Sequence, residues 1–282
     1  MGPKLSIKLA ATILVLLLIT TAVSGEKTYT FGVLNQRNPV LTAQYWNPIL
    51  EYVSKKSGVA LQLQMGKTVQ ETDGMTERGE FDFIFSNHIF MPRISKTGYQ
   101  VIARPAEESI QGQIVVLENA PIRALEDLEG KEVAFPSETA FVAYAVTMNA
   151  MQQKGIQVKP VFAGNQEGVM GQLKAGRVPA ASVNSQVMLE FARREQIKFR
   201  ALWSSEKFAA MPIAVHRRVG KKQVKAVREA LVGMASDPEG LKVLQVCAAV
   251  VKQSPPLGFV TAGGRDYENQ RNFYRTTVLK GF

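Results

Sequence analysis

Cysteine and histidine are scarce in this chain, which has one cysteine, Cys247, and two histidines, His88 and His216, in 282 residues. A metal site made of several cysteines or histidines is therefore excluded, although a carboxylate-rich site is not. One thiol cannot close an internal disulfide, so the fold must rely on its hydrophobic core. Because apolar residues surround Cys247, we expect its thiol to be buried and unreactive. We expect no metal and no other cofactor.

The sequence also lacks the short motifs of common catalytic sites. It has no phosphate loop of the GxxxxGK[ST] kind and no GxSxG nucleophile turn. The glycines of its most glycine-rich loop, residues 163–171, do not have the GxGxxG spacing. These absences argue against an enzyme, and we predict no catalytic residue. A secreted enzyme stays open as the weakest alternative.

Positive charge is in excess, with 34 lysines and arginines against 24 acidic residues and a formal net charge of +10. The longest basic groupings, at residues 193–194, 216–218 and 221–222, are short, and no cluster of basic and aromatic residues stands out. This favours a solvated surface over a nucleic-acid partner. The excess suits an anionic ligand, but net charge alone is a weak guide to what a pocket binds.

The N-terminus has the three parts of a secretory signal peptide. Lys4 and Lys8 supply positive charge, residues 9–20 are almost wholly apolar, and residues 23–25 are small enough for a cleavage site. The apolar stretch is shorter than the roughly 20 residues of a membrane-spanning helix. We therefore predict that residues 1–25 are a cleaved signal peptide and that the mature protein is periplasmic. An uncleaved anchor is the alternative.

Strands and helices alternate in the first part of the mature chain. The apolar patterns predict strands over residues 28–34, 60–65 and 81–85, separated by helices over residues 41–57 and 70–78. Gly58 ends the first of these helices. This order is typical of a parallel sheet covered by helices.

A second α/β unit follows between two strand-like connectors, residues 101–116 and 201–215. The helical stretch 224–251 then returns to the first unit. An inserted second lobe crossed twice by the chain explains this order. We place lobe 1 at residues 26–108 and 208–282, and lobe 2 at 109–207. The elements expected in lobe 2 are strands 131–135, 158–162 and 180–183 and helices 140–154, 169–175 and 187–194.

Five short polar stretches follow predicted strands or open predicted helices, where ligands of open α/β sheets bind. Helix N-termini suit an anion because they carry free N–H groups, and hydroxyls add neutral donors. These residue types also serve as helix caps, turns or core residues, so each position has a structural alternative. We expect His88 to be a structural histidine, and Glu138 and Glu167 to face solvent or pair with a base. The stretches are residues 42–45, 86–88, 137–140, 165–167 and 184–186.

Several longer segments together resemble a known family, the PhnD-like phosphate, phosphite and phosphonate substrate-binding proteins of ABC transporters. The resemblance implies an α/β fold of two lobes, the Venus-flytrap architecture of type-2 periplasmic binding proteins. Each lobe is then a mostly parallel sheet flanked by helices, with two hinge crossings. The segments are YWNPILEYVSKKSG (residues 45–58), GEFDF (79–83), LEDLEGKEVAF (125–135), the return strand MPIAVH (211–216), and LGFV (257–260) with residues 266–267.

The resemblance further implies that backbone amides, hydroxyls and a few side chains hold an oxyanion in the cleft between the lobes. Carried over by position, the ligand contacts are Tyr45, Ser86, Asn87, Ser137, Thr139 and Gln166.

The sequence departs from the family at places that decide the ligand. Ser137-Glu138-Thr139-Ala140 stands where phosphonate binders usually have serine-threonine-serine-glycine, and Gln166-Glu167 replaces a histidine-aspartate pair. Pro179 and Asn184 replace two acidic residues that hold the amine of aminophosphonates. These departures argue against an aminophosphonate and leave a simpler oxyanion or a different solute as the candidate ligands.

The partners expected from the resemblance are a small anionic ligand and an ABC permease in the inner membrane. The same fold also serves sensory proteins that close on a ligand and then contact a histidine kinase or chemoreceptor. That alternative includes another oxyanion, such as an arsenic species, as the ligand.

Overall fold

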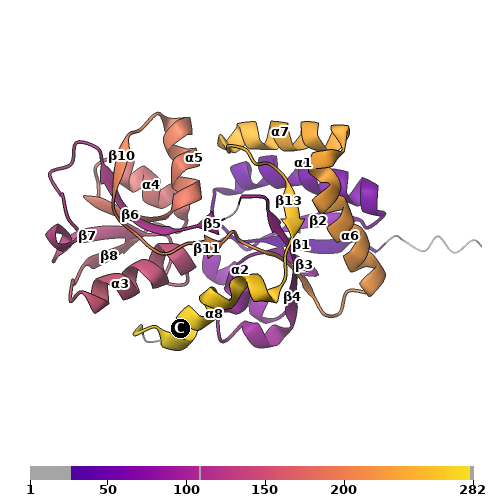
Figure 1. Ribbon diagram of the computed structural model, residues 1–282, viewed down its shortest axis with the longest axis horizontal. Coiled ribbons are helices and arrows are strands. Elements are labelled where there is room, and N and C mark those ends of the chain that lie inside the picture. Colours follow the sequence, from indigo (N-terminus) through magenta and orange to yellow (C-terminus); the bar gives the residue numbers. More distant parts are fainter. Residues whose placement is uncertain (1–26, 108, 280–282) are drawn as a thin grey trace, which may run out of the picture.

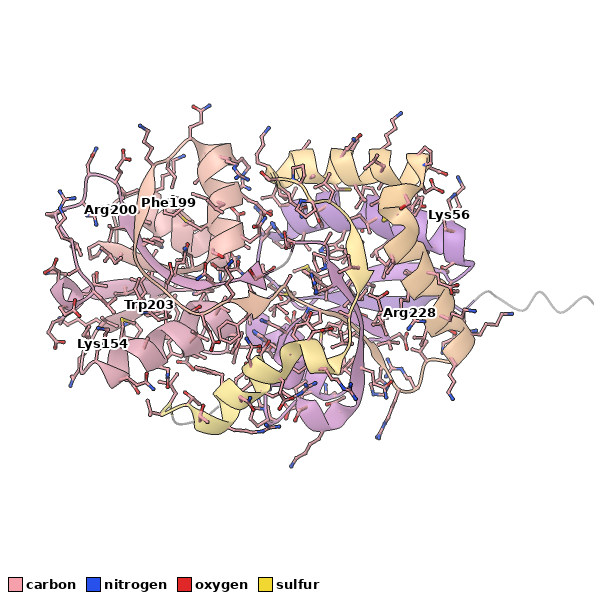
Figure 2. All side chains as sticks on the ribbon, in the orientation of Figure 1. Lys56, Lys154, Phe199, Arg200, Trp203 and Arg228 are labelled. Atoms are coloured by element: carbon pink, nitrogen blue, oxygen red, sulfur yellow. The ribbon has the colours of Figure 1, made fainter. Side chains whose placement is uncertain are left out.

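The computed structural model describes residues 27–107 and 109–279, and in Figure 1 the chain forms two bodies side by side. The predicted signal peptide, residues 1–25, lies outside the described residues. Within the described ranges, no helix is long and apolar enough to span a membrane. Long basic side chains such as Lys56 and Lys154 project from the outer faces of both bodies (Figure 2).

The first body, lobe 1, is built on a six-stranded sheet. Strand β1 pairs in parallel with β2 and β3, and the alternation of strands and helices in the sequence predicted this parallel pairing. Its other three strands run antiparallel to their neighbours. The strand order is β13 (Phe259–Thr261), β4 (Tyr99–Pro105), β12 (Ile213–His216), β3 (Phe83–Phe85), β1 (Tyr29–Val33), β2 (Leu61–Gln64).

The second body, lobe 2, is built on a five-stranded sheet. Strand β7 pairs in parallel with β8 and β9, whereas β6 is antiparallel to both β9 and β10. The strand order is β10 (Phe199–Ser204), β6 (Gly112–Leu117), β9 (Ala180–Asn184), β7 (Glu132–Phe135), β8 (Lys159–Phe162).

Both sheets are therefore mixed, and the expectation of mostly parallel sheets is wrong. The reason lies in the two connectors. The chain leaves lobe 1 through β4 and returns through β12, and it enters lobe 2 through β6 and leaves through β10. Each outgoing strand lies beside the returning one, so the two must run in opposite directions.

Helix α1 (Pro39–Ser57) covers one face of the first sheet, and its ends follow from its sequence. Asn38 caps the N-terminus by accepting a hydrogen bond from the Leu41 amide, and Gly58 ends the helix with φ = 66°. Its buried face, which includes Trp46, packs in a core with α6 and α7. The other helices of lobe 1 are α2 (Val69–Glu77), α6 (Lys221–Gly233), α7 (Pro238–Val251) and α8 (Glu268–Thr276).

Lobe 2 departs from the predicted helix over residues 140–154 at its first turn. Residues Phe141–Val146 form a π-helix, and only Thr147–Gln153 continue as the α-helix α3. The widened turn presents residues 140–143 to the space between the lobes. The remaining helices, α4 (Gln166–Lys174) and α5 (Ser185–Glu195), match the predicted positions.

The two bodies are joined by a two-stranded antiparallel ribbon of β5 (Ser109–Ile110) and β11 (Phe208–Ala209). The lobe boundaries expected near residues 108 and 207 stay a prediction, and both fall next to this ribbon. Helix α8 also reaches from lobe 1 to lobe 2, below the ribbon in Figure 1. Its Phe273 and Tyr274 pack against Phe141 of the π-helix.

Candidate ligand-binding site

A small cavity of about 30 Å³ lies between the two lobes. We call it the serine cavity, after Ser137. Most of its polar lining lies at or just after the carboxyl ends of β1, β3, β7, β8 and β9, and α2, the π-helix and Met211 contribute the rest of its lining. The carboxyl ends of strands from both sheets thus face one another, where α/β proteins bind ligands. The polar residues that line it are Asn35, Gln36, Asn87, His88, Ser137, Gln166 and Asn184.

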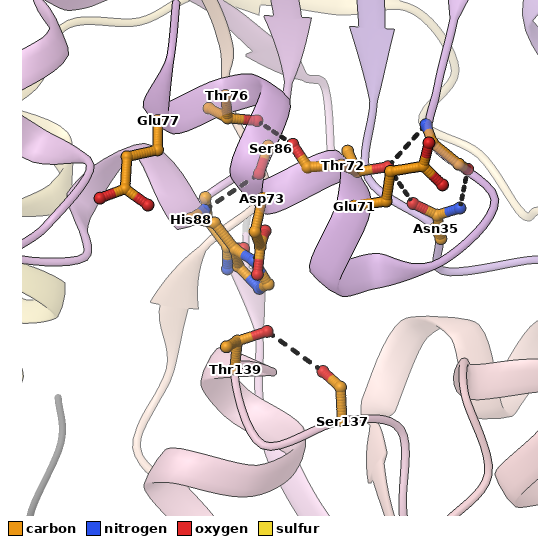
Figure 3. A network of polar contacts seen from close by, with 12 residues as sticks. Asn35, Glu71, Thr72, Asp73, Thr76, Glu77, Ser86, His88, Ser137 and Thr139 are labelled. Carbon is orange, nitrogen blue, oxygen red and sulfur yellow. Dashed lines mark hydrogen bonds and ion pairs between the residues drawn. The ribbon is translucent and has the colours of Figure 1, made fainter.

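Ser137, a predicted ligand contact, lies at the lobe 2 side of this cavity. It follows β7 and is 2% exposed, and its hydroxyl lies 3.3 Å from the Thr139 hydroxyl. Thr139 does not line the cavity. Its hydroxyl is near enough to the Asp73 carboxylate of lobe 1 to lower the pKa of that carboxyl, and Figure 3 shows Thr139 below the Asp73 and His88 side chains. Thr139 therefore joins the lobes at the edge of the site.

His88 lines the serine cavity from lobe 1. Its Nδ1 lies 2.6 Å from Asp73 Oδ1 of α2, and both side chains are 1% exposed. Burial by itself raises the pKa of Asp73, but His88, Thr139 and Arg93 outweigh burial and hold that pKa below 3.8. Asp73 is then a carboxylate, which can only accept a hydrogen bond, so Nδ1 carries the proton. His88 thus makes the structural contact that was expected, and it also lines the cavity as part of the candidate stretch 86–88.

Asn87 and Ser86, the other predicted residues after β3, have different places. Ser86 does not line the cavity, and its buried hydroxyl accepts a hydrogen bond of 3.1 Å from the His88 amide. The Asn87 carbonyl accepts one from Gln270 of α8. Within residues 27–107 and 109–279, no group hydrogen-bonds to the Asn87 side-chain amide, which lines the cavity. Asn87 is thus available to a ligand, whereas Ser86 shapes the turn.

Gln166 closes the lobe 2 side and also touches lobe 1. It begins α4, which Asn165 caps, and its amide donates to the Gln36 carbonyl across the cleft at 3.1 Å. Its side-chain Oε1 accepts from the Asn184 amide at 3.2 Å. Gln166 therefore holds the lobes together as well as lining the cavity.

A second cavity of about 30 Å³ adjoins the first, and the two share Gln36, Asn184 and Met211. We call it the tyrosine cavity, because the predicted residue Tyr45 lines it and does not line the serine cavity. The Tyr45 hydroxyl donates to Gln253 Oε1 at 2.9 Å. Tyr45 therefore lies apart from Asn87, Ser137 and Gln166 in the structure.

An ion pair between the lobes borders the tyrosine cavity. Arg37, in the loop before α1, pairs with Glu190 of α5. Their side chains are 13% and 3% exposed, so both charges are largely removed from water in this conformation. Burial opposes the charge of Arg37, but Glu190 outweighs it and raises the Arg37 pKa. The structure is therefore a closed conformation held by a buried ion pair.

A family profile described as the periplasmic phosphonate substrate-binding protein of ABC transporters matches residues 31–253. The chain belongs to this phosphonate-binding family. No curated protein sequence matches it. The resemblance read from the sequence is thereby confirmed, and the family is one of periplasmic transport proteins and not of enzymes.

Solved structures show the same fold for this family member. PhnD1 from Prochlorococcus marinus, in complex with methylphosphonate, is 14% identical, with a TM-score of 0.74 over 89% of this chain and 98% of PhnD1. A binding protein component of an ABC phosphonate transporter from Pseudomonas aeruginosa is 13% identical, with a TM-score of 0.75 over 88% and 85% of the two chains. A Xanthomonas citri protein bound to ATP is 15% identical, with a TM-score of 0.67 over 88% and 97%.

Three further expectations for this family member are confirmed. Glu138 is exposed to solvent. Glu167 pairs with Arg194 of α5 at 2.5 Å. Cys247 is 1% exposed, and burial raises the pKa of its thiol to about 11, so it stays a protonated thiol at neutral pH. None of these three residues lines either cavity.

Glu107 is a further acidic residue of the tyrosine cavity that the sequence did not single out. Burial first, and repulsion by Glu190 second, raise the pKa of its carboxyl to about 7 from 4.5. A raised pKa means that the folded protein holds this proton more tightly than the unfolded chain. The stability it contributes is present below pH 4.5 and is lost as the pH rises to about 7.

We therefore expect Glu107→Gln to be more stable than the wild type at about pH 8, by about 1–2 kcal/mol after allowance for partial exposure. At acid pH the two proteins should unfold alike, because glutamine mimics the protonated carboxyl. Urea unfolding at both pH values measures the difference. The same difference at both values would contradict the assignment.

Proposed function

We propose that this family member captures a small oxyanion, such as phosphate, phosphite or a short phosphonate, in the serine cavity and delivers it to an ABC permease. The observation that carries the proposal is that the hydrogen-bonding groups of this cavity come from both lobes. Asn87 belongs to lobe 1, and Ser137 and Gln166 belong to lobe 2. A ligand that touches both lobes stabilises the closed form by its differential affinity.

The size and polarity of the cavity favour a compact anion. Its volume of about 30 Å³ suits a few water-sized groups and excludes a bulky solute in this conformation. The amide of Asn87 and the hydroxyl of Ser137 are neutral donors. The N-terminus of α4 adds positive partial charge, although its Gln166 and Gly168 amides already donate to Gln36 and Asn165. Tetrahedral oxyanions have the acceptors that such a set requires.

Replacing Ser137 by alanine tests the proposal. We expect it to weaken binding of methylphosphonate or phosphite by about 10- to 100-fold, because it removes one hydrogen bond to a charged group worth about 1.5–3 kcal/mol. The unfolding temperature should change by only a few °C, because the other contact of this hydroxyl is the long one to Thr139. Titration calorimetry against phosphate, phosphite, methylphosphonate and arsenate measures the affinity.

Ser95→Ala is the matched control, because Ser95 is an exposed serine of lobe 1 outside both cavities. It should bind like the wild type. Failure of all four oxyanions to bind the wild type would overturn the proposal. Uptake of the bound oxyanion by cells that carry the wild-type chain, and its loss with Ser137→Ala, tests delivery to a permease. Binding without uptake would support the sensory role instead.

A further inference from the structure

The serine cavity has one titratable side chain in its lining, that of His88. No lysine, arginine, aspartate or glutamate side chain of the described residues lines it. An anion buried there meets neutral donors from every other side, and burying a charge without a countercharge is costly. His88 is the group that can supply a positive charge at this place.

The surroundings of His88 prepare it for that role. Asp73 accepts the Nδ1 proton, which fixes the ring and leaves Nε2 as the nitrogen for another partner. The nearest other charges lie behind Asp73. Arg93 reaches Asp73 Oδ2 at 3.5 Å and also pairs with Glu77 at 2.6 Å, and the buried Tyr274 of α8 lies near Asp73.

The pair Asp73–His88 is also the buried link from α2 to the cavity. Both residues are 1% exposed, so bulk water does not screen their interaction. Arg93 is 39% exposed, and its charge is shared with Glu77, so it balances Asp73 only in part. Asp73 therefore retains negative charge to stabilise an imidazolium next to a bound anion.

We propose that His88 binds the oxyanion through Nε2 and takes up a proton when the oxyanion binds. The inference rests on the proposed function, because it assigns the positive charge of the same site. A neutral ring presents the Nε2 lone pair, which repels an oxyanion, whereas the imidazolium donates an Nε2–H hydrogen bond to it. Supplying this proton costs more free energy as the pH rises. The affinity for the oxyanion therefore falls, by up to about tenfold for each pH unit.

The first test compares methylphosphonate affinity of the wild type and His88→Gln from about pH 5.5 to about pH 9. The ratio of the two affinities cancels the titration of methylphosphonate itself. We expect the wild type to bind about 10 to 100 times more tightly than His88→Gln at the acid end. This advantage should fall steadily toward one-fold or below as the pH rises. His216→Gln is the matched control, because His216 lies on β12 outside both cavities, and its ratio should stay near one.

The second test keeps His88 intact, so it does not depend on the folding of a variant at that site. The chain has two histidines, so the imidazole ¹H–¹⁵N spectrum of His216→Gln reports on His88 alone. Adding methylphosphonate at about pH 8 should convert His88 from the neutral Nδ1–H form to the doubly protonated form. A His88 ring that stays neutral in the complex, together with a pH-independent affinity ratio, would overturn the inference.

The two proposals fail in different ways. If no oxyanion binds to the wild type at any pH, the proposed function fails. If methylphosphonate binds to the wild type but the proton count at His88 does not change, the oxyanion site stands and the role of His88 is wrong.

Discussion

Arg37→Met should weaken oxyanion binding by about 100-fold or more while it leaves the unfolding temperature of the ligand-free protein nearly unchanged. Removing one member of a buried ion pair costs about 3–5 kcal/mol, because the other charge stays buried alone. At about 1.4 kcal/mol for each factor of ten, that loss corresponds to at least 100-fold in affinity. Glu190, at 3% exposure, would be the abandoned charge.

The cost falls on closure and not on folding, because the pair joins different lobes. Arg37 precedes α1 in lobe 1 and Glu190 belongs to α5 in lobe 2. When the lobes separate, water can solvate Glu190 again. Calorimetry gives the affinity, and small-angle X-ray scattering in saturating ligand shows whether the variant stays open.

A rescue variant and a control variant test this expectation. Arg37→Met combined with Glu190→Gln removes both charges and should recover most of the lost affinity. Lys174→Met breaks a pair with Glu195 inside lobe 2 whose side chains are 45% and 33% exposed. Such surface pairs contribute about 0–1 kcal/mol, so binding should hardly change. Wild-type affinity in Arg37→Met alone would show that the pair does not hold the closed form.

Gly112→Ala should lower the unfolding free energy by about 3 kcal/mol or more and also weaken ligand binding. A Cβ at Gly112 would lie 2.1 Å from the Val142 carbonyl oxygen and 3.2 Å from the Thr147 side chain. The backbone at Gly112 cannot retreat, because its amide and carbonyl both hydrogen-bond to Ser205. Overpacking of this kind typically costs about 1–3 kcal/mol, and here the obstacle is backbone.

We expect weaker ligand binding in Gly112→Ala because Val142, whose carbonyl the new Cβ would displace, belongs to the cavity lining. Val142 is part of the π-helix Phe141–Val146, and it lines the serine cavity. Gly171→Ala is the control, because Gly171 is inside helix α4 and a Cβ there meets nothing within 4 Å. Alanine should stabilise that helix by up to about 1 kcal/mol. Thermal unfolding of both variants checks the contrast, and equal unfolding temperatures would contradict it.

The fold was predictable where the sequence is periodic. The strands around Phe31 and Phe83 and the helix through Trp46 have clear patterns, and all three are in the structure. The antiparallel pairing of the connector strands could not be predicted, because it depends on which strands become neighbours in the sheet. The ribbon strands β5 and β11 have two residues each and are too short to show any period.

The sequence could predict the part of the candidate site that lies at the ends of strands. Asn87, Ser137 and Gln166 meet because each follows a strand whose carboxyl end faces the cleft. Tyr45 lies in the other cavity, because its direction depends on how α1 is rotated on the sheet. The pair Arg37–Glu190 joins residues 153 positions apart and leaves no local pattern in the sequence.

The partner of His88 was hidden for a similar reason. Asp73 lies in α2, before β3, and looks like one polar residue among several on an exposed helix. Only the packing of α2 against the loop after β3 buries its carboxylate beside the imidazole. A lone histidine in a sequence therefore gave no sign of its charge partner.

Helix α8 links the two lobes on one side of the cleft. Gln270 of this helix donates a hydrogen bond to the Asn87 carbonyl next to the serine cavity. Phe273 and Tyr274 pack on Phe141 of the π-helix. The contacts between α5 and lobe 1, by contrast, include the polar ones of Arg37 with Glu190 and of Arg193 with Ser254, and water can replace them. In Figure 1, α5 and α7 lie on the opposite side of the β5–β11 ribbon from α8. We therefore expect the lobes to separate more readily at the tyrosine cavity than at α8, so that a ligand passes Tyr45 before it reaches His88.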